Sequence, residues 1–503
     1  MFLDLSVLQE SLHLIEQSAI PTLIVCAASS ILSTALGFCC AFFLLRPTLP
    51  FRLFFFALVV SCLAIPLHVH ACHWMILLGR NGLFTASIQK IFPDFSLYSI
   101  AGAVWITGIS FSPLSAIVCI FSFVHSSNTG LADQTRLYLT PAQRFFWVLL
   151  PYRIWGALLS FLLVFLLSMG EMAVCDLLGI DTLGRQIYLF LSLYYRPDMA
   201  ILMSIPILFI AILVCLFFPF LLKKEKDSLP GSIPRWGNIF PQKPKKTIFW
   251  IFPLVFCMPY ILSLPVLLLA IGNIQNLYHT YFSLAQEFWH SFALSIGSSF
   301  LILSLAMPLS WMVLRKLFPR NFFFLVMLWI AILPSPLTAI GVLRIFTQAS
   351  DIPFVSDLFL FLRDTDAILI MGLFIRYFPF VFLVCIVGMI YLPIQLEETA
   401  SLFGYSRLQQ FFYVVLPFSK NVLLLAFFTG FLLCLFDLNL TLLLVPPGIT
   451  TLTIRIFTLL HYGVRSDVAI ASLFLIFMAF CVILAGCFIF FQVSKYSKSL
   501  SEK

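Results

Sequence analysis

Apolar residues form long, uninterrupted runs along the chain, and most polar residues lie between these runs. A helix that crosses a hydrocarbon layer of about 30 Å needs about 20 apolar residues, and eleven runs reach that length. The runs lie near 19–45, 53–78, 97–124, 153–177, 198–222, 248–272, 290–314, 322–346, 367–391, 421–445 and 468–493. A β-barrel would show short segments of alternating residues instead. The pattern therefore predicts an all-α, polytopic membrane protein with about 11 transmembrane helices.

The composition agrees with this prediction and narrows the possible functions. Hydrophobic residues make up 62% of the 503 residues, charged residues make up only 10%, and the mean hydropathy is +1.07. A soluble protein carries about 25% charged residues, so a soluble fold is excluded. The 13 cysteines lie almost entirely within apolar runs and are expected to be small buried hydrophobes. No P-loop, zinc or hydrolase motif occurs, so we expect neither an enzyme nor a cofactor in this chain.

The net charge of +8 bears on topology. Lys and Arg lie between the apolar runs and not on one basic surface, so no nucleic-acid partner is expected. Cytoplasmic loops of membrane proteins are enriched in these residues. If the loop after the first run is cytoplasmic, 20 of the 29 Lys and Arg residues fall on that side, seven on the other and two within runs. This bias predicts an N-terminus outside and a C-terminus in the cytoplasm.

An internal repeat organises the chain. The segments 132–151 and 398–417 lie 266 positions apart and share six identical residues in 20. In the first copy the identical positions are Gln143, Phe145, Phe146, Val148, Leu150 and Pro151. A second match, at a distance of 269 positions, joins Thr182 to Thr451. Runs 1 to 5 therefore correspond to runs 7 to 11, and run 6 has no counterpart.

The repeat also predicts the domain boundaries. The first half comprises 1–222 with five runs, and the second half comprises 248–503 with six runs. The segment between them, 223–247, is basic and contains Pro and Gly, so we expect a cytoplasmic linker.

The second copy of the repeated segment carries a spaced pattern of acidic, small and proline residues. The pattern consists of Glu398, Ala400, Gly404, Leu416 and Pro417. It resembles the EAA loop of ABC-importer permeases, in which two short helices joined by a glycine turn dock on a soluble ATPase. Glycine suits such a turn because it has no Cβ. The resemblance implies that these residues form an ATPase-coupling loop, and the alternative is an ordinary amphipathic loop.

The first copy departs from this pattern. Ala132 stands at the position of the glutamate and Tyr138 at that of the glycine, whereas Pro151 is kept. Asp133 follows one position later and is a substitute for the missing acid. We therefore expect the two loops to couple unequally.

Three further segments, 78–83, 375–379 and 440–463, resemble permeases of the ferric-iron type. The resemblance covers nearly the whole chain and implies a fused, two-half permease of the type I ABC-importer fold in the bacterial cytoplasmic (inner) membrane. It also implies two copies of a cytoplasmic ABC ATPase subunit, which would use ATP and magnesium, and a periplasmic or extracellular solute-binding protein. Ferric iron is the first substrate candidate, and thiamine or another small solute is the alternative.

A rival interpretation from a different class is an ion-coupled secondary transporter. Such transporters also use internal repeats, broken helices and intramembrane acids. They do not need paired coupling loops on the cytoplasmic side, and co-purification of an ATPase would separate the two classes.

Charged residues within the apolar runs are candidates for the translocation pathway. Glu171 and Asp437 lie 266 positions apart and are therefore equivalent in the repeat. Arg376 has Ser110 at the equivalent position. An intramembrane charge usually faces protein or water. The acids are expected to line or brace the pathway, or else to form helix-packing hydrogen bonds, and Arg376 is expected to pair with one of them as a structural bridge.

A short histidine-rich segment lies near the outer end of the second run. His68, His70, Cys72 and His73 have spacings of three and four residues, which would let pairs share a metal on a helix. Ferric iron, however, prefers oxygen ligands. The alternative is that these are interfacial polar residues that cap a helix.

Overall fold

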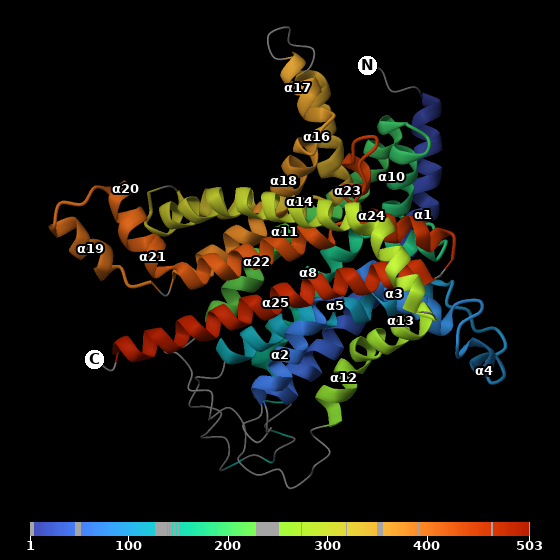
Figure 1. Ribbon diagram of the computed structural model, residues 1–503, viewed down its shortest axis with the longest axis horizontal. Helices are drawn as coiled ribbons and strands as arrows, with labels where there is room; N and C mark the ends of the chain where they lie inside the picture. Colours follow the sequence, from blue (N-terminus) through green and yellow to red (C-terminus); the bar gives the residue numbers. More distant parts are fainter. Residues whose placement is uncertain are drawn as a thin grey trace. The chain divides into compact units, whose positions relative to one another are not determined.

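The structure is a computed structural model that describes residues 5–45, 52–125, 138, 140, 143, 147, 150–227, 251–272, 274–317, 319–349, 356–390, 392–463 and 466–501. Every regular element within these ranges is a helix (Figure 1). The chain divides into two compact units. One comprises Met1–Leu277 and Leu459–Leu473, and the other comprises Tyr278–Thr458 and Phe474–Lys503. The helices that correspond to run 6 thus pack with the first unit, although the repeat assigns them to the second half.

The helices follow the same order in both halves of the repeat. The first half contains α1 (Leu5–Leu44), α2 (Arg52–Cys62), α3 (Leu67–Leu78), α4 (Thr85–Gln89), α5 (Ile100–His125), α8 (Leu150–Met169), α9 (Ala173–Leu177), α10 (Leu183–Ser192) and α11 (Pro197–Asp227). Their counterparts are α14 (Ile274–Leu314), α15 (Arg320–Ile332), α16 (Ser335–Ala349), α17 (Ser356–Arg363), α18 (Ala367–Met389), α22 (Lys420–Phe436), α23 (Thr441–Leu444), α24 (Leu452–His461) and α25 (Ser466–Ser501). The helices α12 (Ile251–Ile261) and α13 (Ser263–Ile271) have no counterpart.

Equivalent hydrogen bonds support the repeat at the level of single atoms. The backbone N–H of Leu183, at the start of α10, donates to the Thr22 hydroxyl on α1 over 2.9 Å. The backbone N–H of Leu452, at the start of α24, donates to the Ser291 hydroxyl on α14 over 2.7 Å. Both pairs are 161 residues apart. The first N–H groups of a helix have no partner within that helix, so each unit meets the same need in the same way.

Two equivalent pairs of helices are sharply bent. The bend between α2 and α3 is 90°, and the bend between α15 and α16 is 102°. Pro66 directly precedes α3, and Pro334 directly precedes α16. Proline has no N–H to continue a helix and disfavours the α conformation in the residue before it, which accounts for both breaks.

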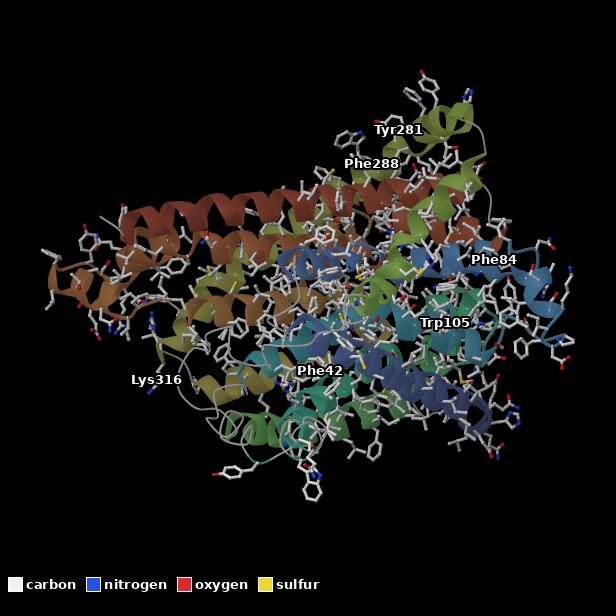
Figure 2. All side chains as sticks on the ribbon, turned by 90° about the horizontal axis from the view of Figure 1, so that it is seen from below. Phe42, Phe84, Trp105, Tyr281, Phe288 and Lys316 are labelled. Carbon is white, nitrogen blue, oxygen red and sulfur yellow. The ribbon has the colours of Figure 1, made fainter. Side chains whose placement is uncertain are left out.

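The helices are those of a multi-pass membrane protein. Within the described ranges, seven helices are long and apolar enough to cross a membrane, or up to ten if each bent pair counts as one span. The apolar part of α8, Arg153–Met169, is shorter. Large apolar side chains also remain on the outside, such as Phe84 and Trp105, which are 56% and 42% exposed (Figure 2). The count of eleven spans and the orientation of the termini stay predictions.

Several predicted boundaries are wrong. The runs 153–177 and 421–445 were expected to be continuous helices, but α8 ends at Met169 and α22 ends at Phe436. Conversely, α1 begins at Leu5, well before the apolar run, because the preceding polar residues continue the helix.

Candidate functional site

The segment that resembles a coupling loop forms two short helices joined by a tight turn. Helix α19 (Gln395–Leu402) contains Glu398 and Ala400, and Gly404 follows with a φ of +82°. Only glycine adopts this conformation without strain, so the turn explains the residue type. Helix α20 (Arg407–Gln410) continues through a π-helical turn, Phe411–Val415, into α21 (Leu416–Phe418) (Figure 1). The local geometry is the helix–turn–helix that the resemblance implies.

A buried ion pair fixes this hairpin to the end of α14. The residue involved is Glu397 and not its neighbour Glu398. The Glu397 carboxylate accepts hydrogen bonds of 2.9 Å from Trp311 Nε1 and from Arg315 Nε, and Arg315 Nη2 also donates to it. The side chains of Glu397 and Arg315 are only 8% and 16% exposed. Phe411 packs against Trp311 at 5.3 Å between ring centroids, with the ring planes tilted by 46°, and extends the contact.

The opposite face of the hairpin is exposed and largely apolar. Leu402, Phe403, Leu408 and Tyr413 are 87%, 78%, 71% and 69% exposed. Glu398 is exposed beside them. We call these five residues the coupling face. Large apolar side chains on a helical hairpin at the end of the long helices are typical of a surface that binds another protein.

The first copy of the loop shares part of this geometry. Ala132 and Asp133 lie outside the described residues, and Tyr138 is 85% exposed. The Thr140 N–H donates to the Gln143 side chain over 3.1 Å, and the Gln143 N–H donates to the Thr140 hydroxyl over 3.3 Å. This reciprocal pair is a capping box, which starts a helix.

The second copy has a capping box at the equivalent positions, Ser406 and Gln409, with distances of 2.8 Å and 3.4 Å. The need for this cap explains why glutamine recurs in both copies. Trp147 of the first copy is 79% exposed and stands at the position of Tyr413. The two loops therefore share a helix start and an exposed aromatic residue.

No protein-family model matches the chain, and no curated protein matches it significantly in sequence. The function must therefore be judged from the geometry of these sites.

Glu171 and Asp437 occupy breaks between helices. Glu171 follows the end of α8 after one residue and precedes the short α9, and Asp437 directly follows α22 and precedes the short α23. Glu171 Oε1 accepts a hydrogen bond of 2.8 Å from the Ala173 N–H. Asp437 Oδ1 accepts from the N–H groups of Leu440 and Thr441 over 3.0 Å and 2.9 Å. Both acids thus cap the start of a short helix, and a role in the pathway stays a prediction.

Arg376 lies on α18 beside this break but does not pair with Asp437. Its Nη1 donates to the carbonyl of Leu333 and, over 3.4 Å, to that of Ala331, at the C-terminal end of α15. These carbonyls have no partner within their own helix, so the guanidinium satisfies them. The hydroxyl of Tyr377 donates to Asp437 Oδ2 over 2.6 Å instead. No salt bridge joins Arg376 to Asp437 among the described residues, and the role of Arg376 in the pathway stays a prediction.

Asp176 joins three elements within the first unit. It receives hydrogen bonds from Arg185 Nε on α10 over 2.9 Å and from His461 Nε2 at the end of α24 over 3.0 Å. The residue lies beyond Met169, where α8 ends, although the predicted run extends to residue 177. Partial burial raises the pKa of the Asp176 carboxyl, but the bonds from His461 and Arg185 outweigh it and hold the pKa below its ordinary value.

The histidine-rich segment forms part of α3. His68, His70, Cys72 and His73 are all buried, so the interpretation as interfacial caps is wrong. The His70 ring lies 5.1 Å from that of His73 and 5.0 Å from that of Tyr260 between centroids. No group of three or more His, Cys, Asp or Glu side chains in the described part of the chain is arranged to hold a metal ion. The four residues thus pack within the helical core.

Proposed function

We propose that this chain is the permease subunit of a binding-protein-dependent ABC importer. The observation that carries the proposal is the pair of repeat-equivalent loops, each with a capping box and an exposed aromatic residue on the side predicted to be cytoplasmic. Two such loops would receive two copies of a cytoplasmic ABC ATPase subunit. ATP and magnesium would act in those subunits, and this chain would supply the path.

The second loop is suited to transmit force because it is braced. A partner that pushes on the coupling face acts on α19, and Glu397 links α19 to Arg315 and Trp311 on the long helix α14. Closure of the ATPase pair would therefore move α14 together with the hairpin. The bundles would then expose the pathway alternately to each side, and a solute-binding protein would deliver the solute on the outside.

The substrate rests on the resemblance alone. Ferric iron is the first candidate, and thiamine or another small solute is the alternative. This part of the proposal includes the pathway candidates Glu171, Asp437 and Arg376. Two acids at equivalent depth would attract a cation, but not so strongly that the cation could not leave.

The proposal is tested by co-purification from the native membrane. We expect wild-type protein to retain an ATPase in a ratio of about two subunits to one chain. Phe403→Asp should lose it, because a charge on the coupling face opposes an apolar contact. Thr399→Asp is the matched control, since it adds the same charge on an exposed position of α19 outside the coupling face. Retention of the ATPase by the Phe403 variant, or uptake into proteoliposomes that an ion gradient drives without ATP, would overturn the proposal.

A further inference from the structure

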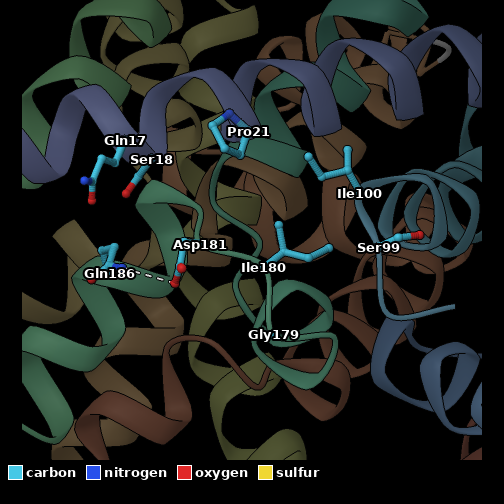
Figure 3. A pocket seen from close by; sticks show the side chains of 9 residues that line it. All are labelled: Gln17, Ser18, Pro21, Ser99, Ile100, Gly179, Ile180, Asp181 and Gln186. Carbon is cyan, nitrogen blue, oxygen red and sulfur yellow. Dashed lines mark hydrogen bonds between the residues drawn. The ribbon is translucent and has the colours of Figure 1, made fainter. Parts of the chain in front are cut away.

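A pocket with both polar and apolar side chains opens in the first unit between α1, the start of α5 and the loop before α10 (Figure 3). Its volume is about 420 Å³, which is within the range of small-ligand sites. Pro21, Ser99, Ile180, Asp181 and Gln186 are among the side chains that line it. Figure 3 shows the bond of 3.3 Å from Gln186 to Asp181 Oδ1 along one wall. The loop lies on the side of the chain predicted to face outward.

The second unit contains the equivalent site, but the ring of an internal side chain fills it. His290 stands at the position of Pro21, 269 residues later, and Thr450 stands at that of Asp181. Asp366 directly precedes α18, as Ser99 directly precedes α5. Gly179 and Gly448 turn both loops with positive φ values of 69° and 84°. The two sites therefore share a backbone frame.

The contacts of His290 show what kind of group fits this place. Its Nε2 lies 3.0 Å from both carboxylate oxygens of Asp366, and its Nδ1 lies 3.1 Å from the carbonyl oxygen of Thr450. A carbonyl and an ionised carboxylate only accept hydrogen bonds, so this place suits a group that donates on both sides. The His290 ring, a planar group with a nitrogen on two sides, is thus held between Asp366 and a loop carbonyl.

The first site differs from the second in the side chain that stands at the position of His290. In the second unit, Glu287 and Asp366 face Arg455 and His290. In the first unit, Pro21 supplies no cation.

Two carboxylates there share one guanidinium, because Arg185 donates to both Asp176 and Asp181. The second oxygen of Asp181 has no partner among the described residues. The open site therefore presents a carboxylate oxygen that can accept hydrogen bonds from a cationic ligand.

We propose that this pocket binds a small planar organic cation with at least two N–H donors, of the guanidinium, amidinium or imidazolium class. The ligand takes the place that the His290 ring occupies in the second unit, and Asp181 supplies the counter-charge. This inference goes beyond the importer function and does not depend on it, because the site is complete within the first unit.

The test is equilibrium dialysis of the purified full chain in nanodiscs with radiolabelled methylguanidine at constant ionic strength. Methylurea, which has the same shape without the charge, is the control ligand. We expect about one bound methylguanidinium per chain and much weaker binding of methylurea. Asp181→Asn should weaken methylguanidinium binding about fivefold, the size expected for a half-exposed ion pair. Asp198→Asn, an exposed acid of the same unit outside the pocket lining, should bind as the wild type.

A second variant tests the equivalence of the two sites. His290→Ala should expose the second site and raise the stoichiometry from about one to about two. Equal binding of methylurea and methylguanidine by the wild type, or no effect of Asp181→Asn, would overturn the proposal. An unchanged stoichiometry in a folded His290→Ala variant would also overturn it. None of these results bears on the ATPase, so the importer function is judged separately.

Discussion

The brace beneath the coupling loop gives the sharpest test of the structure. Replacing Glu397 by alanine removes the carboxylate that receives hydrogen bonds from Trp311 and Arg315. The guanidinium of Arg315 then stays largely buried without a counter-charge. The fold of the long helices does not depend on this contact, so we expect local opening of the hairpin and not global unfolding.

The magnitude follows from burial. Breaking a buried ion pair by removing one partner costs about 3–5 kcal/mol, because a buried charge is left uncompensated. Arg315 retains 16% exposure, so the lower end of about 3 kcal/mol applies. Since 1.4 kcal/mol corresponds to a factor of ten, the open hairpin should become about 100-fold more populated.

The assay is hydrogen–deuterium exchange of the purified protein in nanodiscs. Glu397→Ala should accelerate exchange in 395–415, whereas Glu398→Ala, which removes an exposed acid one position later, should not. The double variant with Arg315→Ala should cost less than the sum of the single variants, because the two side chains act on each other. Equal protection in the Glu397 and Glu398 variants, or strictly additive effects, would refute the reasoning.

Three further predictions follow from other sites. Asp437→Ala should lower the free energy of unfolding by about 3 kcal/mol, because it leaves two buried N–H groups and a hydroxyl without a partner. Glu171→Ala, at a half-buried cap, should lower it by only about 1 kcal/mol. Equal shifts in thermal unfolding would contradict the cap assignment. The lowered pKa of Asp176 contributes stability that is present above the ordinary value of about 3.9 and is lost as the pH falls through the folded value, so Asp176→Asn should flatten the loss of thermal stability below about pH 4. A cysteine at Glu10 should be labelled from outside and one at Arg235 only from inside, and inside labelling at position 10 would refute the predicted topology.

The apolar pattern predicted most of the helices because hydropathy is the main determinant of a membrane helix. It failed at the ends of α8 and α22, where Glu171 and Asp437 interrupt the backbone within an apolar surrounding. A hydropathy pattern does not register that one acidic side chain satisfies the N–H groups of the next short helix. The sequence shows that Glu171 and Asp437 are equivalent in the repeat. It does not show that each accepts hydrogen bonds from the N–H groups of a following short helix.

The residue spacing around Glu398 and Gly404 predicted a helical hairpin, but it did not predict the brace at Glu397. Trp311 and Arg315 lie more than 80 residues before Glu397, so nothing local marks the contact. The one signal was the pair of adjacent glutamates, of which only the second belongs to the resembled pattern. A helix that buries one acid and exposes the next needs a basic partner on the buried side. Arg315, at the end of the long helix α14, is such a partner.

In both halves a side-chain oxygen accepts a hydrogen bond at corresponding helix starts, but the residue that supplies this oxygen differs. Thr22 is replaced by Ser291, and Glu171 by Asp437, yet each pair accepts a backbone N–H at an equivalent place. An N–H without a partner costs several kcal/mol within a membrane, so a repeat of this kind must preserve the acceptor and leaves the residue type free. No such demand acts on Pro21, since its equivalent His290 binds a carboxylate and a carbonyl and caps no helix. Positions whose side chains accept a backbone N–H therefore stay similar in the two halves. Positions that accept no backbone N–H, such as Pro21 and His290, are where the two halves can acquire different chemistry.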